Sequence, residues 1–149
     1  MSHFTEVAVD MLAKNEKCLV EALEEMYGKG HVEVSADGLD LFGYHRDNRN
    51  KLPKTDPNYA PKCNVVVRQQ YVGQDSNDIG YYRTEDGKYK LIVSDYDKGG
   101  NFSAAKQKQV KQGYTASVTQ KQLKAQGYKV SMSKDKAGNL KITASKYSK

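Results

Sequence analysis

The hydrophobic pattern at the start of the chain predicts a strand, a helix and a hairpin, in that order. Residues 3–9 alternate between polar and apolar side chains, which is typical of a short strand. From 11 to 27 the apolar residues recur at helical spacing with charged residues between them, so we expect an amphipathic helix. Residues 31–42 alternate again on both sides of Asp37-Gly38, which predicts a hairpin that turns at this dipeptide.

The central part of the chain predicts a polar loop followed by buried strands. Residues 46–61 contain all three prolines and few apolar side chains, which indicates a long irregular loop. The run of valines within residues 63–68 is typical of a buried strand. Residues 79–84 and 88–94 flank Asp86-Gly87, a strong turn signal, and are expected to pair as a hairpin.

The last third of the chain predicts a long helix and another hairpin. Residues 103–126 are rich in Lys, Gln and Ala, which favour helix, and their apolar side chains recur at helical spacing. Gly127 fits the stop of this helix. Residues 128–133 and 140–145 then predict two paired strands.

Two segments share one pattern, which suggests a fold class. Residues 19–41 and 120–142 each give a helix, a glycine stop, a strand, a turn and a returning strand. Two helix-hairpin units around a central β-hairpin predict an α+β fold, a mainly antiparallel sheet with two helices on one face. The length of 149 residues fits a single domain, 1–149, with the 46–61 loop and the Lys-rich helix and hairpin of 101–149 inside it.

The sequence contains no sign of a membrane segment or of a disulfide framework. No apolar run is long enough to span a bilayer and the N-terminus lacks a signal-peptide pattern, so we expect a soluble cytoplasmic protein with no membrane partner. Cys18 and Cys63 are the only cysteines, which favours reduced thiols.

The charge is divided unevenly along the chain. The net charge is +6, yet residues 1–100 carry 13 Lys and Arg against 17 acids, whereas residues 101–149 carry 11 Lys against Asp135 alone. Clustered lysines attract phosphates, which predicts an anionic partner, although such a cluster can equally be a solvated face. Because the cluster holds no Arg, contacts with nucleic acid would be electrostatic and not sequence-reading.

A set of short motifs occurs in a fixed order along nearly the whole chain. It includes Met1-Ser2-His3-Phe4, Gly43-Tyr44, the strand at 65–68, Asp78-Ile79-Gly80-Tyr81, Tyr89 to Leu91 with Asp95, and Tyr114 with the segment 123–128. This set resembles an uncharacterised family, known as domain of unknown function 1257 or hypothetical chloroplast reading frame 35, with bacterial and phage members. The resemblance implies a small soluble domain of no established activity, whose bacterial genes often lie beside those of AAA+ ATPases or ferredoxin-type proteins.

This chain departs from the family pattern at two places. It has no Trp, where the family usually has Trp around the central hairpin and after the position of Asp95. The 46–61 loop resembles an insertion after Gly43-Tyr44. Both departures suggest a function adapted to a particular ligand.

The sequence holds no motif for a metal, a cofactor or a catalytic centre. The His and Cys residues lack the spacing of metal ligands, and neither a nucleophile motif nor a phosphate-binding glycine loop is present. We therefore expect no cofactor and no metal. Asp78 and Asp95 match family positions and could act as an acid and a base, but each also stands where Asp commonly closes a turn. His3 matches the family opening and either faces a site or bonds within the sheet. A binding protein is favoured over an enzyme.

Tyr and Arg residues provide the candidate ligand site. A Tyr ring can stack on a base while its hydroxyl bonds a phosphate, and Arg supplies bidentate phosphate contacts; the alternative is that the tyrosines fill a half-polar sheet. We expect Tyr81, Tyr82 and Arg83 to form a pocket with Tyr44 and Arg68, under a lid formed by 46–61. The candidate ligand-binding residues are Tyr44, Arg46, Arg49, Arg68, Tyr81, Arg83, Lys106, Lys111 and Tyr114.

The leading hypothesis is a non-enzymatic binding protein for an anionic, phosphate-bearing ligand, in particular a nucleotide or a nucleotide-derived signal, which a phage-encoded protein would sequester. The first alternative is sequence-independent nucleic-acid binding through the Lys-rich last third. The second is an adaptor for an AAA+ ATPase or a ferredoxin-type protein partner. Open antiparallel sheet edges also leave a homo-oligomer as an alternative.

Overall fold

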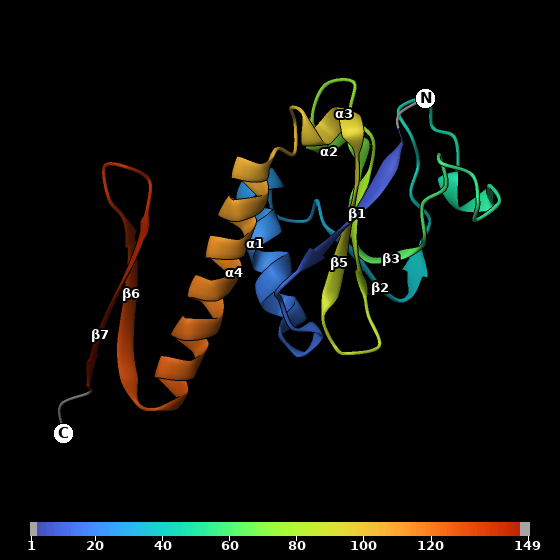
Figure 1. The fold of residues 1–149 in the computed structure, drawn as a ribbon. Helices are drawn as coiled ribbons and strands as arrows, with labels where there is room; N and C mark the ends of the chain where they lie inside the picture. Colours follow the sequence, from blue (N-terminus) through green and yellow to red (C-terminus); the bar gives the residue numbers. More distant parts are fainter. Residues whose placement is uncertain (1–2, 147–149) are drawn as a thin grey trace.

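The computed structural model describes residues 3–146 and has an α+β fold built on an antiparallel sheet (Figure 1). The sheet has five strands in the order β1-β5-β4-β3-β2, and a separate two-stranded sheet follows near the C-terminus. The strands are β1 Phe4–Val9, β2 Glu33–Leu39, β3 Cys63–Val67, β4 Ile79–Arg83, β5 Tyr89–Ser94, β6 Tyr128–Lys134 and β7 Leu140–Lys146. The predicted fold class is confirmed.

Two long helices lie on one face of the five-stranded sheet. In Figure 1, α1 (Glu16–Tyr27) lies between the sheet and α4 (Ala104–Ala125). A Cβ added to Gly113 of α4 would lie 3.0 Å from the Cβ of Ala22 in α1, so glycine at this position lets the two helices approach closely. Two short helices, α2 (Gln69–Val72) and α3 (Asp95–Lys98), follow β3 and β5, and 3-10 turns occupy Ala13–Asn15 and Arg49–Lys51.

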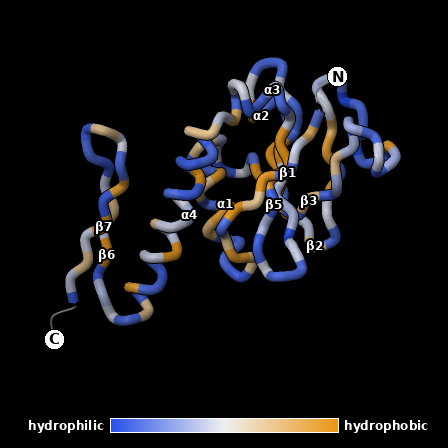
Figure 2. Tube along the Cα trace, viewed as in Figure 1, coloured by the Kyte–Doolittle hydropathy of each residue, from blue (hydrophilic) through white to orange (hydrophobic). Residues whose placement is uncertain are grey.

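Both faces of the sheet are buried, but by different parts of the chain. The helices cover one face and enclose a core with Val65, Val67 and Leu91. The segment 40–62 covers the other face, where Leu41 and Ala60 pack with residues such as Val66. Because neighbouring residues of a strand point to opposite faces, the apolar run in β3 contributes to both cores. Figure 2 shows this concentration of hydrophobic residues in the strands and α1.

The predicted hairpin over 31–42 is wrong. These residues form one strand, β2, which pairs with β3 through Val34↔Val65 and Leu39↔Cys63. The intervening residues bulge out, and the Asn64 side chain bridges the bulge by donating to the carbonyl oxygens of Ser35 (3.0 Å) and Ala36 (3.1 Å). Asp37-Gly38 therefore belongs to a bulge and not to a turn. The helix-hairpin unit predicted over 19–41 is wrong for the same reason, since of the two segments only 120–142 is a helix followed by a hairpin.

The other long elements agree with the prediction. The central hairpin forms as β4 and β5, the long C-terminal helix as α4, and the last hairpin as β6 and β7. The first helix begins later than predicted, at Glu16, after a 3-10 turn. Met1 and Ser2 of the motif at the N-terminus lie outside the described residues.

Cys18 and Cys63 are both buried free cysteines. Burial raises the pKa of the Cys63 thiol well above its usual range, so this thiol stays protonated and unreactive. Among residues 3–146, no helix is both long and apolar enough to span a bilayer.

Candidate functional site

An open groove of about 620 Å³ lies at one end of the sheet, beside α2. Its walls come from the chain after β2, from α2 and from the turn that leads into β4. The lining residues are Phe42, Tyr44, Arg46, Arg68, Gln69, Gln70, Gly73, Asp75, Ser76 and Asp78. The structure thus brings together four of the residues singled out in the sequence, namely Tyr44, Arg46, Arg68 and Asp78.

The floor of the groove is built around the buried carboxylate of Asp78. Its Oδ2 accepts hydrogen bonds from the Phe42 amide (2.9 Å) and the Arg68 guanidinium (2.9 Å), and its Oδ1 accepts one from the Gln69 amide (2.8 Å). Asp78 therefore fixes both the start of α2 and the chain beyond β2. Burial raises the pKa of Asp78, against the opposing effect of these hydrogen bonds.

Arg68 is largely occupied by contacts within the protein. It donates to Glu33 (2.7 Å) and to the Asp40 carbonyl (2.7 Å), in addition to Asp78, and its guanidinium lies 5.7 Å from the centre of the Phe42 ring. Burial lowers the pKa of Arg68, but the two carboxylates outweigh burial and raise it. Arg68 thus holds the wall of the groove together and contributes little free positive charge.

A second buried polar network holds the rim. Asn77 accepts a hydrogen bond from the Tyr44 amide (2.8 Å) and donates to the Ser94 hydroxyl (2.9 Å). Asp97, at the start of α3, accepts from the Asn77 amide (3.0 Å) and from the Ser94 hydroxyl (2.9 Å). The backbone at Tyr44 is therefore anchored to the core, although its side chain is exposed.

The rim presents an aromatic ring and a free cation. The Tyr44 side chain is 46% exposed and lies 4.8 Å, centre to centre, from the ring of His45. A hydrogen bond to Asp75 raises the pKa of Tyr44. Arg46 is exposed, and within residues 3–146 its side chain makes no hydrogen bond or ion pair. An exposed ring beside a free guanidinium can bind a planar group joined to an anion.

The remaining residues of the predicted Tyr/Arg pocket lie elsewhere. Tyr81 is buried in the helix-side core, with its ring edge-on to that of Tyr89 at 6.4 Å. Arg83 is at the far end of β4 and pairs with Glu16 at 2.6 Å. Tyr82 is on the opposite face and donates to Glu6 (3.3 Å).

Arg49 and most of the 46–61 loop have a structural role. Arg49 is 2% exposed, pairs with Asp47 at 2.5 Å, donates to the Asn58 carbonyl (3.0 Å) and lies over the ring of Phe4. These contacts fasten the loop to the second face of the sheet. Arg46, at the start of the loop, is the part of it that lines the groove.

The candidate residues of α4 are also away from the groove. The buried Tyr114 hydroxyl accepts from the Leu12 amide (2.8 Å) and from Asn15 (3.2 Å), while Lys111 donates to the Asp10 carbonyl. Lys106 is half-buried in the first turn of α4.

The two remaining candidates, His3 and Asp95, meet through their backbones. The His3 carbonyl accepts from the Asp95 amide (2.8 Å), and both residues are exposed. Asp95 begins α3 and is not among the residues that line the groove with Asp78.

Several groove residues were missed in the sequence because they carry no motif. Phe42 lies in the chain beyond β2, Gln69 and Gln70 in a one-turn helix, and Asp75 and Ser76 in a polar turn. The one usable signal was the polar turn at 73–77, directly before the family-like Asp78-Ile79-Gly80.

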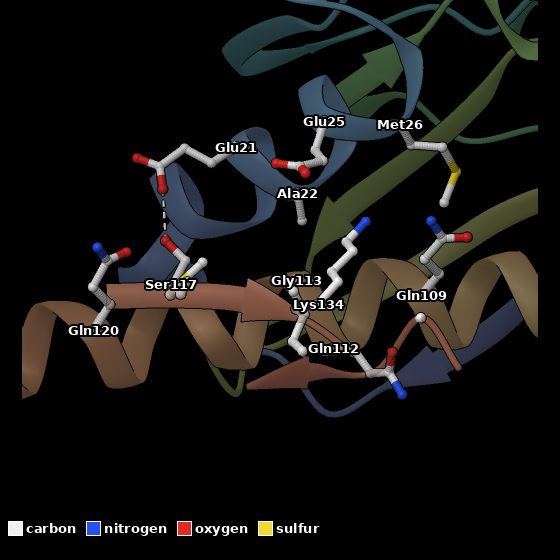
Figure 3. A pocket seen from close by; sticks show the side chains of 13 residues that line it. Glu21, Ala22, Glu25, Met26, Gln109, Gln112, Gly113, Ser117, Gln120 and Lys134 are labelled. Carbon is white, nitrogen blue, oxygen red and sulfur yellow. Dashed lines mark hydrogen bonds between the residues drawn. The ribbon is translucent and has the colours of Figure 1, made fainter. Parts of the chain in front are cut away.

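A smaller hollow of about 160 Å³ separates the C-terminal hairpin from the two long helices (Figure 3). Glu21, Glu25 and Met26 of α1 form one wall, and Lys134 of the hairpin extends into the space opposite them. Glu21 also accepts a hydrogen bond from Ser117 of α4 (2.6 Å). The carboxylates of Glu21 and Glu25 in the wall of this hollow do not favour an anionic ligand.

Neither hollow offers a metal centre. Within residues 3–146, no group of three or more His, Cys, Asp or Glu side chains is arranged to hold a metal ion.

Comparisons with known proteins identify a family. Residues 40–143, which include the groove and most of the C-terminal hairpin, match the family described as "Protein of unknown function (DUF1257)". No curated protein and no solved structure matches the chain. Because the match covers more than half of the sequence, the chain belongs to the DUF1257 family.

Proposed function

We propose that this protein is a non-enzymatic binding protein for a phosphate-bearing ligand, in particular a nucleotide or a nucleotide-derived signal, held in the groove beside α2. One observation carries the proposal. Among residues 3–146, Arg46 (φ 63°) and Asp75 (φ 59°) are the only non-glycine residues with a left-handed backbone, and both line this groove. Strained backbone of this kind concentrates at ligand sites, because the surrounding structure is built to hold it.

The turn at 43–47 forces Arg46 into this conformation. The Gly43 amide donates to the Asp47 carbonyl (2.9 Å), and the Arg46 amide donates to the Gly43 carbonyl (2.8 Å). A Cβ added at Gly43 would lie 2.6 Å from the Asp47 carboxylate and 2.7 Å from the Arg49 guanidinium, so a larger residue here would displace this ion pair. The protein thus holds an exposed guanidinium, which has no partner within residues 3–146, on a strained turn.

The groove suits a ligand with a ring and a phosphate. Its volume of about 620 Å³ is within the usual range for small-molecule sites. The Tyr44 ring offers a stacking surface and Arg46 a bidentate phosphate contact, while Gln70 adds an exposed amide. Asp78 is occupied by its hydrogen bonds and Asp75 by Tyr44, so neither carboxylate is available as a general base, which favours binding over catalysis.

Isothermal titration calorimetry with ATP, ADP and AMP tests the proposal. We expect Arg46→Gln to weaken binding at least tenfold and Tyr44→Ala to weaken it several-fold. The matched control is Arg83→Gln, which removes an Arg at the far end of β4 and should leave binding unchanged. Equal affinities for wild type and Arg46→Gln, or no binding of any of the three nucleotides, would contradict the proposal.

Native mass spectrometry of the protein purified from its own host distinguishes the alternatives. A copurified small molecule that is lost in Arg46→Gln supports ligand binding. A protein partner that copurifies equally with both variants, without a small molecule, instead supports the adaptor hypothesis and counts against the groove.

A further inference from the structure

The C-terminal hairpin of β6 and β7 stands apart from the body of the protein. In Figure 1 it lies on the far side of α4 from the five-stranded sheet, and its main contacts are with α4. Because the family match extends through most of this hairpin, to residue 143, the hairpin is part of the family fold. Its two strands pair in full register from Tyr128↔Lys146 to Lys134↔Leu140.

The two faces of this hairpin differ in chemistry. The inner face carries Val130, Met132, Leu140 and Ile142, and Met132 and Leu140 line the hollow next to the helices. The outer face, which alternates with the inner one, carries only Lys, Ser and Thr, all exposed: Lys129, Ser131, Ser133, Lys141, Thr143 and Ser145. The hairpin therefore presents a wholly polar face to solvent.

The charge of the hairpin is strongly positive and largely unneutralised. Residues 128–146 contain five lysines and one acid, Asp135. Asp135 closes the turn by accepting from the amides of Ala137 (2.9 Å) and Asn139 (2.9 Å). Among residues 3–146 the hairpin lysines form no ion pair, whereas Lys111 and Lys121 of α4 pair with Asp10 and Glu21. Lys129 and Lys141 belong to the outer face and Lys136 to the turn, whereas Lys134 and Lys146 belong to the inner face. The outer face and the turn therefore present three lysines that have no acidic partner within the described residues.

We propose that the outer face of the β6–β7 hairpin binds duplex DNA without sequence preference. A two-stranded ribbon fits the major groove, which is about 12 Å wide, and strands of seven residues extend about 23 Å along it. The hydroxyls of Ser and Thr and the ammonium groups of Lys contact phosphates. This surface does not depend on the groove beside α2.

The composition of the outer face favours a duplex over a single strand. Single-strand binding relies on aromatic side chains that stack on bases, and the one aromatic residue of the described hairpin, Tyr128, belongs to the inner face, where the Lys146 ammonium lies 5.7 Å from its ring centre. The face also lacks Arg, the residue that most often reads guanine, which accounts for the absence of sequence preference.

Fluorescence anisotropy of the full chain with a fluorescein-labelled 24-base-pair duplex tests this proposal. Three phosphate contacts, made by Lys129 and Lys141 of the outer face and Lys136 of the turn, predict that log K falls with log [salt] with a slope of about −2.7. In Lys129→Gln/Lys141→Gln the slope should fall to about −0.9, and the affinity in about 0.1 M salt should drop roughly 60-fold. The matched control is Lys54→Gln/Lys98→Gln, with the same change of net charge on exposed residues of the body.

Three results would overturn the proposal. The first is an equal loss in both double variants, which would mean that net charge alone matters. The second is no binding of the duplex in about 50 mM salt, and the third is tighter binding of the single strand. Circular dichroism confirms that the variants fold. ATP should still bind the hairpin variant, so failure here leaves the nucleotide site testable by itself.

Discussion

The left-handed backbone of Arg46 allows the backbone strain at this position to be tested separately from the charge of its side chain. Arg46→Ala and Arg46→Gly remove the same guanidinium, but only glycine adopts φ 63° without a steric penalty. That penalty is about 1–2 kcal/mol for a residue with a Cβ. Glycine in turn lowers the free energy of unfolding by about 0.5–1 kcal/mol, because it gives the unfolded chain greater conformational freedom. We expect Arg46→Gly to be more stable than Arg46→Ala by about 0.5–1 kcal/mol.

Urea unfolding followed by circular dichroism measures this difference between the two variants. Because Arg46 is exposed and its side chain has no partner within residues 3–146, the loss of the side chain itself should change stability by less than about 0.5 kcal/mol. Neither variant should bind nucleotide, although the glycine variant is relieved of strain. A glycine variant no more stable than the alanine variant would refute the strain, and with it the observation on which the proposed site rests.

Three further changes test the structure around the groove and the sheet. Asp78→Asn should destabilise the fold by about 3 kcal/mol in urea unfolding, because it leaves Arg68 without its buried partner; a loss below about 1 kcal/mol would contradict this role. Gly80→Ala should cost about 1–3 kcal/mol, since the new Cβ would lie 2.6 Å from the Cys63 Cβ, and an unchanged urea midpoint would count against this packing. Glu16 has a lowered pKa, because burial, which raises it, is outweighed by hydrogen bonds from Arg83 and a tyrosine. The contribution of the ionised Glu16 to the free energy of unfolding is fully present above pH 4.5 and is lost as the pH falls through the folded-state pKa. Glu16→Gln should therefore make the Tm decline less steeply as the pH is lowered below 4.5.

Periodic elements were predictable from the sequence, and local exceptions were not. The valines of β3 and the Asp86-Gly87 turn each carry a signal that short-range physics explains, and both elements formed as expected. Asp37-Gly38 carries a similar turn signal, but the Asn64 side chain captures the adjacent carbonyls and converts the turn into a bulge. That outcome depends on a residue of another strand, which no local pattern reveals.

The groove was predictable in part. Tyr44 and Arg68 were expected in a ligand site, and both line the groove. Tyr81 was expected beside them, but it alternates onto the helix-side face of β4 and is buried there. Arg46 was predicted only as one of several cations of the loop. That Arg46 stays exposed while Arg49 is buried in an ion pair depends on the tight turn at Gly43, which only the structure shows.

The segment 40–62 also determines how the protein tolerates damage. It is polar in sequence, yet it covers Phe4, Val66 and Ile92 on the second face of the sheet. If a protease cuts this segment and it detaches, a continuous apolar surface becomes exposed on strands that lie side by side, and such surfaces aggregate. We therefore expect the segment 40–62 to act as a solubility shield, and a chain cut within it to aggregate.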